Sequence, residues 1–262
     1  MYRGFNIENI SFTAKNDLVQ QYERSILDID INENLIDFLD DDYVFDASAI
    51  QKDWFPQINA DIFISHSHRD EKTAKALAMW LKNEFNLTAF IDSAVWGYFE
   101  DLLLTIQQTT DLASATSHVH MMLNMALMQM IDKTECLFFL NTPNSITLSN
   151  EIDAGTYSPW IYSELGISQM IDKKLPERYT RQAFSSRGSE SLLLIEDAKF
   201  RYDLDISHLI TLGNSELNAW HQKVNPTEFR ANALRYAGQA TYKKHPLDVL
   251  YMLYPLNQHI RG

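Results

Sequence analysis

Short apolar runs that end abruptly in polar residues constrain the fold of this chain more than any other feature. The run IFI at 62–64 stops in SHSH, and such a run is typical of a buried strand in a parallel sheet. Apolar residues at helical spacing follow at 70–85, with Asp70 as the expected N-cap, and TAFID at 88–92 is a second apolar run. A strand, a helix and a strand within about thirty residues predict a right-handed βαβ unit.

The same alternation continues along the chain. The further expected elements are helices at 99–108, 118–132 and 158–171 and strands at 136–142, 191–197 and 205–212. Five strands alternating with helices predict an α/β fold with a doubly wound, flavodoxin-like parallel sheet. Residues 213–262 contain the helix-like segments ELNAWHQKV, NPTEFRANALRYAG and PLDVLYMLYPL, so we expect a C-terminal helical appendage there.

The first 58 residues differ in composition from the rest. They hold 4 basic and 12 acidic side chains, a net charge of -8 within the total of -13. Apolar residues alternate with acids in ENLIDFLDDDYVFDAS, and the aromatic residues Trp54 and Phe55 lie near the end of the segment. We therefore expect residues 1–58 to be an acidic N-terminal extension that docks on a main domain at 59–212.

Composition excludes several classes of function. With 22 basic against 35 acidic side chains, the chain lacks the excess of Lys and Arg that binds a phosphate backbone, so we expect no nucleic-acid partner. The single cysteine, Cys136, can form neither an internal disulfide nor a multi-cysteine metal site, which favours a reducing compartment. Because there is no apolar run of roughly 18 residues and no signal-peptide pattern, we expect a cytoplasmic protein without a membrane partner.

One acidic residue lies within an apolar helical stripe. Ser158 is the expected N-cap and Pro159 the first residue of the helix that starts there. The residues that share one face of this helix are Trp160, Glu164, Ile167 and Ile171. Two interpretations are open: a glutamate that faces solvent or forms an ion pair, or a carboxylate removed from water beside an aromatic wall, whose pKa would rise.

Several motifs together resemble the Toll/interleukin-1 receptor (TIR) domain, in particular bacterial TIR proteins and NAD-cleaving TIR enzymes. These motifs are DIFISHSH, the helix after it, FID before a loop, WGYFEDLLLTI after that loop, and TYSPWIYSEL. The resemblance covers about residues 59–212, and the spacing of Trp160 and Glu164 matches the Trp-x-x-x-Glu of the NAD-cleaving members. The chain departs from the family in an extra segment at about 109–132, and in the stretch from His66 to His68, where a basic residue often stands.

The resemblance implies a fold of TIR type and an NAD glycohydrolase or cyclase activity, which free-standing bacterial members often use in antiphage defence or signalling. It implies that Glu164 is catalytic, that Phe99 and Trp160 form aromatic walls, and that residues 92–98 form the loop that gates the site. The residues expected to bind the dinucleotide are Ser65, His66, Ser67, Asp70, Trp96, Phe99 and Trp160. NAD is then a substrate, and no separate cofactor is expected. The acceptor of the ADP-ribosyl group stays open: it is either water or a ring atom of the same molecule.

As the bond between nicotinamide and ribose breaks, the ribose becomes a cation, which a nearby carboxylate would stabilise. Nicotinamide needs no strong acid in order to leave. The resemblance also implies a homo-oligomer through TIR–TIR contacts and a downstream effector protein. The alternative is a TIR module that acts only by assembling with other TIR domains. The pair Trp160 and Glu164 favours the enzyme, since such an adaptor has no chemical reason to keep it.

Other patterns in the sequence do not lead us to expect a further functional site. HSHRD at 66–70 begins like a dinuclear-metal motif, but Glu71 follows where that motif has His, so we expect no metal site. The Met-rich helix at 118–132 is interpreted as core packing rather than a partner surface, with His118 and His120 at its polar start. Cys136 is expected to be an inert core thiol. Nucleoside deoxyribosyltransferases, a related fold that also uses a carboxylate at a ribosyl centre, are the alternative family, and the first strand motif favours TIR.

Overall fold

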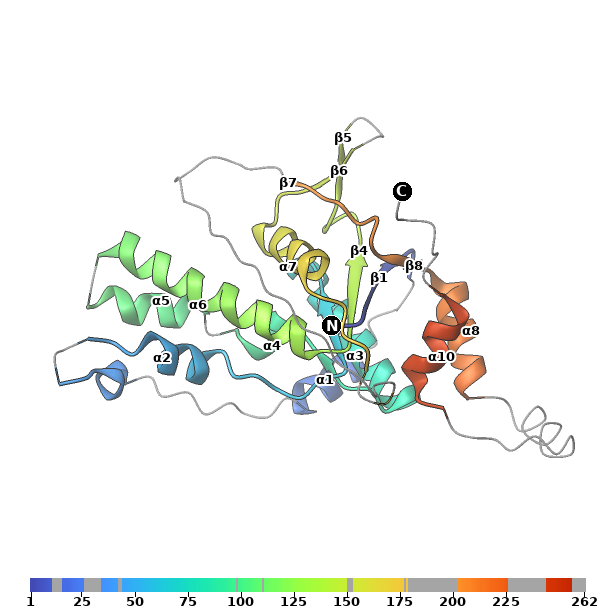
Figure 1. Ribbon diagram of the computed structural model, residues 1–262, viewed down its shortest axis with the longest axis horizontal. Helices are drawn as coiled ribbons and strands as arrows, with labels where there is room; N and C mark the ends of the chain where they lie inside the picture. The colour runs from blue at the N-terminus through green and yellow to red at the C-terminus, as the bar shows by residue number, and fades with distance from the viewer. Residues whose placement is uncertain are drawn as a thin grey trace, which may run out of the picture.

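The computed structural model describes residues 1–10, 16–25, 34–41, 44–97, 99–109, 111–149, 153–176, 178, 202–225 and 244–255. Its centre is a sheet of five parallel strands in the order β3-β2-β4-β1-β8 (Figure 1). These strands are β1 (Arg3–Glu8), β2 (Ile62–Ser65), β3 (Ala89–Phe90), β4 (Cys136–Asn141) and β8 (Ile210–Leu212). The described α-helices are α1 (Asn16–Ser25), α2 (Ala47–Trp54), α3 (Glu71–Phe85), α4 (Asp92–Val95), α5 (Phe99–Gln107), α6 (Leu112–Lys133), α7 (Pro159–Met170), α8 (Asn214–Val224) and α10 (Pro246–Leu253). The predicted α/β fold with a five-stranded parallel sheet is confirmed.

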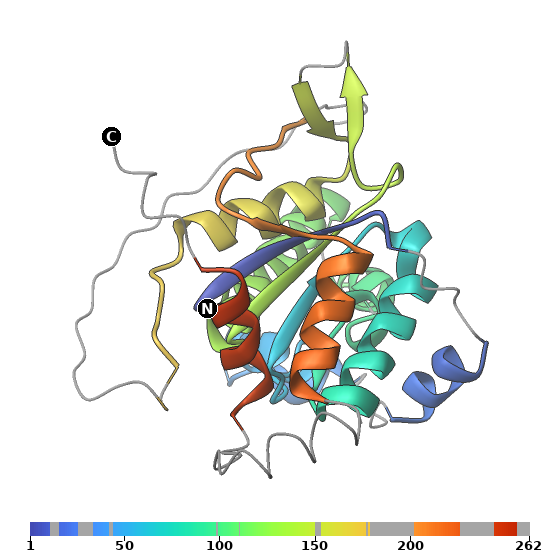
Figure 2. The ribbon, with the colours of Figure 1, turned by 90° about the vertical axis from the view of Figure 1, so that its right-hand side faces the viewer.

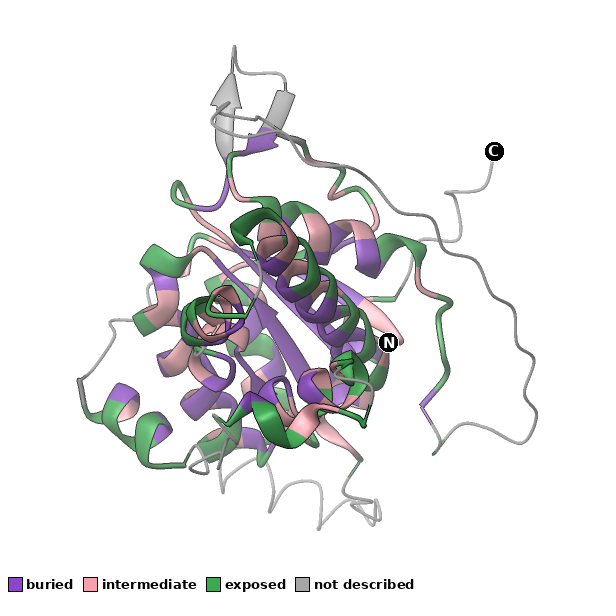
Figure 3. Cartoon of the chain, turned by 90° about the vertical axis from the view of Figure 1, so that its left-hand side faces the viewer, coloured by how far each residue is buried: buried purple, intermediate pink, exposed green. Residues whose placement is uncertain are grey.

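Helices cover both faces of this sheet. On one face Phe63 and Phe139 join a buried cluster with side chains of α2, α6 and α7. On the other face Phe5, Ile64 and Trp220 belong to a second cluster with α3, α8 and α10. Neighbouring residues of a strand thus enter opposite clusters, as the two-residue period of a strand requires. Figure 2 shows α3, α8 and α10 in front of the sheet and α6 and α7 beyond it, and Figure 3 shows the buried residues on the sheet and the inward helix faces.

The N-terminal segment corrects one expectation. Residues 3–8 are not part of an appended extension, because β1 lies inside the sheet, where Phe5 is paired with Phe138 of β4 and with Ile210 of β8. Net charge misled the prediction, since the acids of the first 58 residues begin only at Glu8, after a stretch whose single charged side chain is Arg3 and whose apolar residues Phe5 and Ile7 suit a buried strand. The expected strand at 191–197 lies outside the described residues.

The described residues between 34 and 58 contribute to one of the two buried clusters. A short 3-10 helix, η1 (Leu35–Phe38), precedes α2, whose N-cap Asp46 accepts hydrogen bonds from the backbone N–H groups of Ser48 and Ala49. Ile50 and Trp54 of α2 are buried in the cluster that also holds α6 and α7. Within the described parts of the chain, no helix is long and apolar enough to cross a membrane.

The Met-rich helix is longer than predicted and only partly buried. It begins at Leu112 rather than 118, because Asp111 caps it by accepting the N–H of Ser114 at 3.0 Å. His118 and His120 therefore lie within α6 and not at its start, and the core-packing interpretation holds only in part. Met122 and Met130 are buried, but other methionines of α6 are exposed: Met121, Met125 and Met128.

The remaining predicted helices are confirmed: α3, α5, α7 and α8 agree within two residues, and α10 begins as predicted but ends at Leu253, three residues before the end of the predicted segment. The segment NPTEFRANALRYAG lies outside the described residues except for its first residue, Asn225. A second, antiparallel sheet was not expected. It is formed by β5 (Thr147–Ser149), β6 (Asp153–Thr156) and β7 (Tyr202–Asp203), and β6 leads directly into α7.

Candidate functional site

The start of α7 is fixed by local chemistry, as predicted. The Ser158 hydroxyl caps the helix by accepting the backbone N–H of Ile161 at 3.3 Å, and Pro159 occupies the first turn. Trp160 and Glu164 then lie one turn apart on the side of α7 that meets the sheet and α6. Trp160 is half-buried, whereas the Glu164 side chain is in the core.

Glu164 is a buried acid without a basic partner in the described chain. It is 1% exposed, and its Oε2 accepts a hydrogen bond of 2.5 Å from the Ser65 hydroxyl at the end of β2. Burial raises the pKa of Glu164 well above its usual range, and the nearby Asp92 carboxylate raises it further. The Ser65 hydrogen bond acts in the opposite direction. Of the two interpretations of this residue, the structure favours the carboxyl removed from water.

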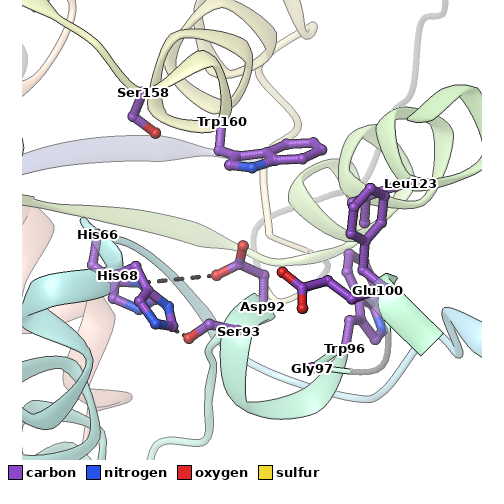
Figure 4. A pocket seen from close by; sticks show the side chains of 11 residues that line it. His66, His68, Asp92, Ser93, Trp96, Gly97, Glu100, Leu123, Ser158 and Trp160 are labelled. Atoms are coloured by element: carbon purple, nitrogen blue, oxygen red, sulfur yellow. Dashed lines mark hydrogen bonds and ion pairs between the residues drawn. The ribbon is translucent and has the colours of Figure 1, made fainter. Parts of the chain in front are cut away.

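A cavity of about 470 Å³ opens beside this helix, at the carboxyl ends of β2 and β3 (Figure 4). Ligands bind at this edge of open parallel sheets. The lining residues are His66, His68, Asp92, Ser93, Trp96, Gly97, Phe99, Glu100, Leu123, Ser158 and Trp160. In Figure 4 the Trp160 ring lies on one side and Asp92, Ser93 and Glu100 lie across from it. The cavity therefore has an aromatic wall and an acidic wall.

The aromatic wall is a packed group of three rings. Phe99 and Trp160 meet edge to face with centroids 5.8 Å apart, and the ring of His120 packs on Phe99 at 5.2 Å and on Trp160 at 5.7 Å. Burial lowers the pKa of His120, which favours its neutral form. Leu123 and His120 come from α6, so the segment that departs from the TIR pattern supplies part of the wall.

Polar contacts order the opposite wall. His66 is buried, its Nε2 lies 3.1 Å from the Ser93 hydroxyl, and its Nδ1 lies 3.3 Å from the carbonyl oxygen of Ile64. The Asp92 carboxylate lies 3.8 Å from the same Nδ1. Trp96 is held in place by its indole N–H, which donates to the carbonyl of Pro56 at 3.2 Å.

The structure brings together most of the predicted site residues. His66, Trp96, Phe99 and Trp160 line the cavity, and Ser65 holds Glu164 just behind that lining. Of the expected gating segment 92–98, residues 92–95 form the short helix α4, and Tyr98 lies outside the described residues.

Two predicted residues lie elsewhere. Among the described residues that line the cavity, neither Ser67 nor Asp70 appears. Asp70 occupies the N-cap position of α3, but its carboxylate does not cap that helix. It accepts instead a hydrogen bond of 2.5 Å from Thr142 and one of 2.8 Å from Asn144, so it ties α3 to the loop after β4.

Glu100 and His120 were not among the predicted site residues, and Asp92 and Ser93 were predicted only as members of the gating segment 92–98. Asp92 ends the run TAFID at 88–92 and Ser93 follows it, and polar residues at the carboxyl end of a parallel strand were the available signal. No such signal existed for His120, because its contacts depend on how α6 packs. In the described part of the chain, no three His, Cys, Asp or Glu side chains are grouped so as to hold a metal ion.

Comparisons of the chain with models of protein families, with curated proteins and with solved structures give no match.

Proposed function

We propose that this chain cleaves the bond between nicotinamide and ribose in NAD, as a glycohydrolase or cyclase, with Glu164 as the carboxylate that stabilises the ribosyl cation. One observation carries the proposal: a buried glutamate with no basic partner in the described chain lies one helical turn from Trp160, beside a cavity with an aromatic and an acidic wall. Burying an acid in this way is costly for folding, which supports a functional reason for it.

The charge of the substrate matches this site. Oxidised nicotinamide is a cation, and aromatic faces and carboxylates both attract cations. Asp92 and Glu100 line the cavity, and a positive ring near them would lower the pKa of the Glu164 carboxyl and favour its ionised form.

Glu164 is not among the residues that line the cavity, so it would act on the ribosyl cation through its charge rather than by direct contact. At an effective dielectric constant of about 20, two unit charges about 5 Å apart interact by roughly 3 kcal/mol. An interaction of that size made only in the transition state corresponds to roughly two powers of ten in rate. No general acid is needed on the nicotinamide side, because the leaving group departs neutral.

We extend the proposal to the fold, which we assign to the TIR type. The succession β2, α3, β3, α5, β4 and α7 agrees with the order of motifs in the resemblance, and this part of the chain builds the cavity. The strand β1 comes from outside the segment that carries the resemblance.

The setting that the family suggests, antiphage defence or signalling in the cytoplasm with a downstream effector, is part of this proposal. The unpaired, buried thiol of Cys136 supports a reducing compartment.

A second candidate function is assembly without catalysis. Met121, Met125 and Met128 of α6 are 53%, 40% and 37% exposed, and their spacing places them on one helical stripe. Exposed methionines are typical of adaptable protein interfaces, so this stripe supports a homo-oligomer. Assembly is also compatible with the enzyme.

Incubation with NAD at high protein concentration separates the two candidates, with nicotinamide measured by chromatography and the oligomeric state by light scattering. The enzyme predicts nicotinamide from the wild type and its loss in Glu164→Gln, with Asp17→Asn on α1 as an exposed control carboxylate outside the cavity lining. Oligomers that release no nicotinamide would favour the assembly function.

A further inference from the structure

A serine, a histidine and an aspartate meet on the acidic wall of the cavity. His66 follows β2, and Asp92 and Ser93 begin α4 after β3, the neighbouring parallel strand. Figure 4 shows the three side chains at one side of the cavity, across from Trp160. Ser93 lines the cavity, so its hydroxyl can meet a bound molecule.

Hydrogen bonding sets the tautomer of His66. The carbonyl oxygen of Ile64, 3.3 Å from Nδ1, can only accept, so the proton of the neutral imidazole is on Nδ1. Nε2 then carries a free lone pair and accepts the Ser93 hydroxyl at 3.1 Å. This is the arrangement in which a histidine acts as general base on a serine. The Asp92 carboxylate, 3.8 Å from Nδ1, would stabilise the imidazolium after proton transfer.

The charges of the cavity select the electrophile that such a serine would attack. Acyl transfer develops negative charge on a carbonyl oxygen, which the acids Asp92 and Glu100 would oppose. Ribosyl transfer develops positive charge on the sugar, which the same acids and the nearby Glu164 would stabilise. A ribosyl centre is therefore the electrophile that fits.

We propose that Ser93, activated by His66, is a covalent acceptor that takes the ADP-ribosyl group of NAD, so that the chain modifies itself within its own cavity. This inference rests on the proposed function. The bond between Ser93 Oγ and C1′ of the ribose forms while the bond between C1′ and the nicotinamide nitrogen breaks. The electron pair of that bond neutralises the ring, nicotinamide leaves, and the Ser93 proton passes to Nε2 of His66 and on to solvent.

The test combines intact mass, peptide mapping and nicotinamide release on the full chain incubated with NAD. The wild type is expected to gain the mass of one ADP-ribosyl group, mapped to the peptide that contains Ser93. Ser93→Ala should show no adduct at this peptide. His66→Gln keeps an acceptor for the hydroxyl but not a base, so its adduct should form about 100-fold more slowly. Ser114→Ala, on the first turn of α6, is the control and should gain the adduct as the wild type does.

The outcomes separate this inference from the proposed function. Nicotinamide released without an adduct at Ser93, or with an adduct mapped elsewhere, overturns the inference and leaves the proposed function in place. An adduct that forms equally fast in His66→Gln also overturns it. No nicotinamide from the assembled wild type overturns both. Because mapping of the wild type locates the adduct directly, a variant that fails to fold does not weaken the test.

Discussion

Replacing Glu164 with glutamine should stabilise the fold above the usual pKa of a glutamate, and the gain should grow with pH. The folded state raises the pKa of Glu164 well above its ordinary value of 4.5, mainly through burial. Between the unfolded and the folded pKa, the folded chain holds a proton that the unfolded chain has released. The free energy of unfolding therefore falls as pH rises through this window.

The magnitude follows from linkage. A full proton of difference changes the free energy of unfolding by about 1.4 kcal/mol per pH unit. Glu164→Gln does not titrate, and its amide oxygen can still accept the Ser65 hydroxyl. The variant should match the wild type near pH 4.5 and exceed it by up to about 3 kcal/mol two pH units higher, roughly 5–10 °C in Tm for a chain of this size.

The assay is urea and thermal unfolding of both proteins from pH 4.5 to 8, with Asp17→Asn as the control. Only the difference between variant and wild type is used, so that titrations of other groups largely cancel. A difference that does not change with pH would mean that Glu164 titrates at its ordinary pKa, and the argument from burial would be refuted. A gain in stability with a loss of activity would be the pattern of a site kept for function.

Three further outcomes are expected. Deletion of residues 1–10 removes β1 from between β4 and β8, so circular dichroism and hydrogen exchange should show loss of the native fold, whereas a folded truncated chain would contradict the strand order. Trp220→Ala empties a fully buried site and should cost about 3–5 kcal/mol in urea unfolding; a cost below about 1 kcal/mol would contradict its burial. Trp160→Ala should raise KM for NAD about tenfold through loss of the aromatic wall, Trp160→Phe should restore most of it, and an unchanged KM in both would exclude Trp160 from the site.

Local sequence patterns predicted the elements that their own residues determine. The run at 62–64, the apolar spacing of α3 and the Ser158-Pro159 start of α7 each depend on neighbours within a few residues, and all three are found. The burial of Glu164 was one of two open interpretations, because helical periodicity places a residue on a face but does not say what covers that face.

Long-range pairing accounts for what the sequence did not predict. The position of β1 between β4 and β8 depends on partners more than a hundred residues away. The segment is short and its hydrophobic pattern is weak, so the sequence alone did not predict a strand there. The contacts of His120 and the meeting of Ser93 with His66 likewise arise only when separate loops and helices come together. Net charge was misleading for the first residues, since it averages over a segment that contains both a core strand and a surface helix.

The most direct test of the central claim is the rate of nicotinamide release from NAD at pH 7 by the wild type and by Glu164→Gln at equal, high protein concentration. The account predicts release by the wild type and a decrease of about 100-fold or more in the variant, which corresponds to the roughly 3 kcal/mol expected for a carboxylate about 5 Å from the ribosyl cation. Equal rates in the two proteins would contradict the role of Glu164, and no release from either would contradict the proposed activity.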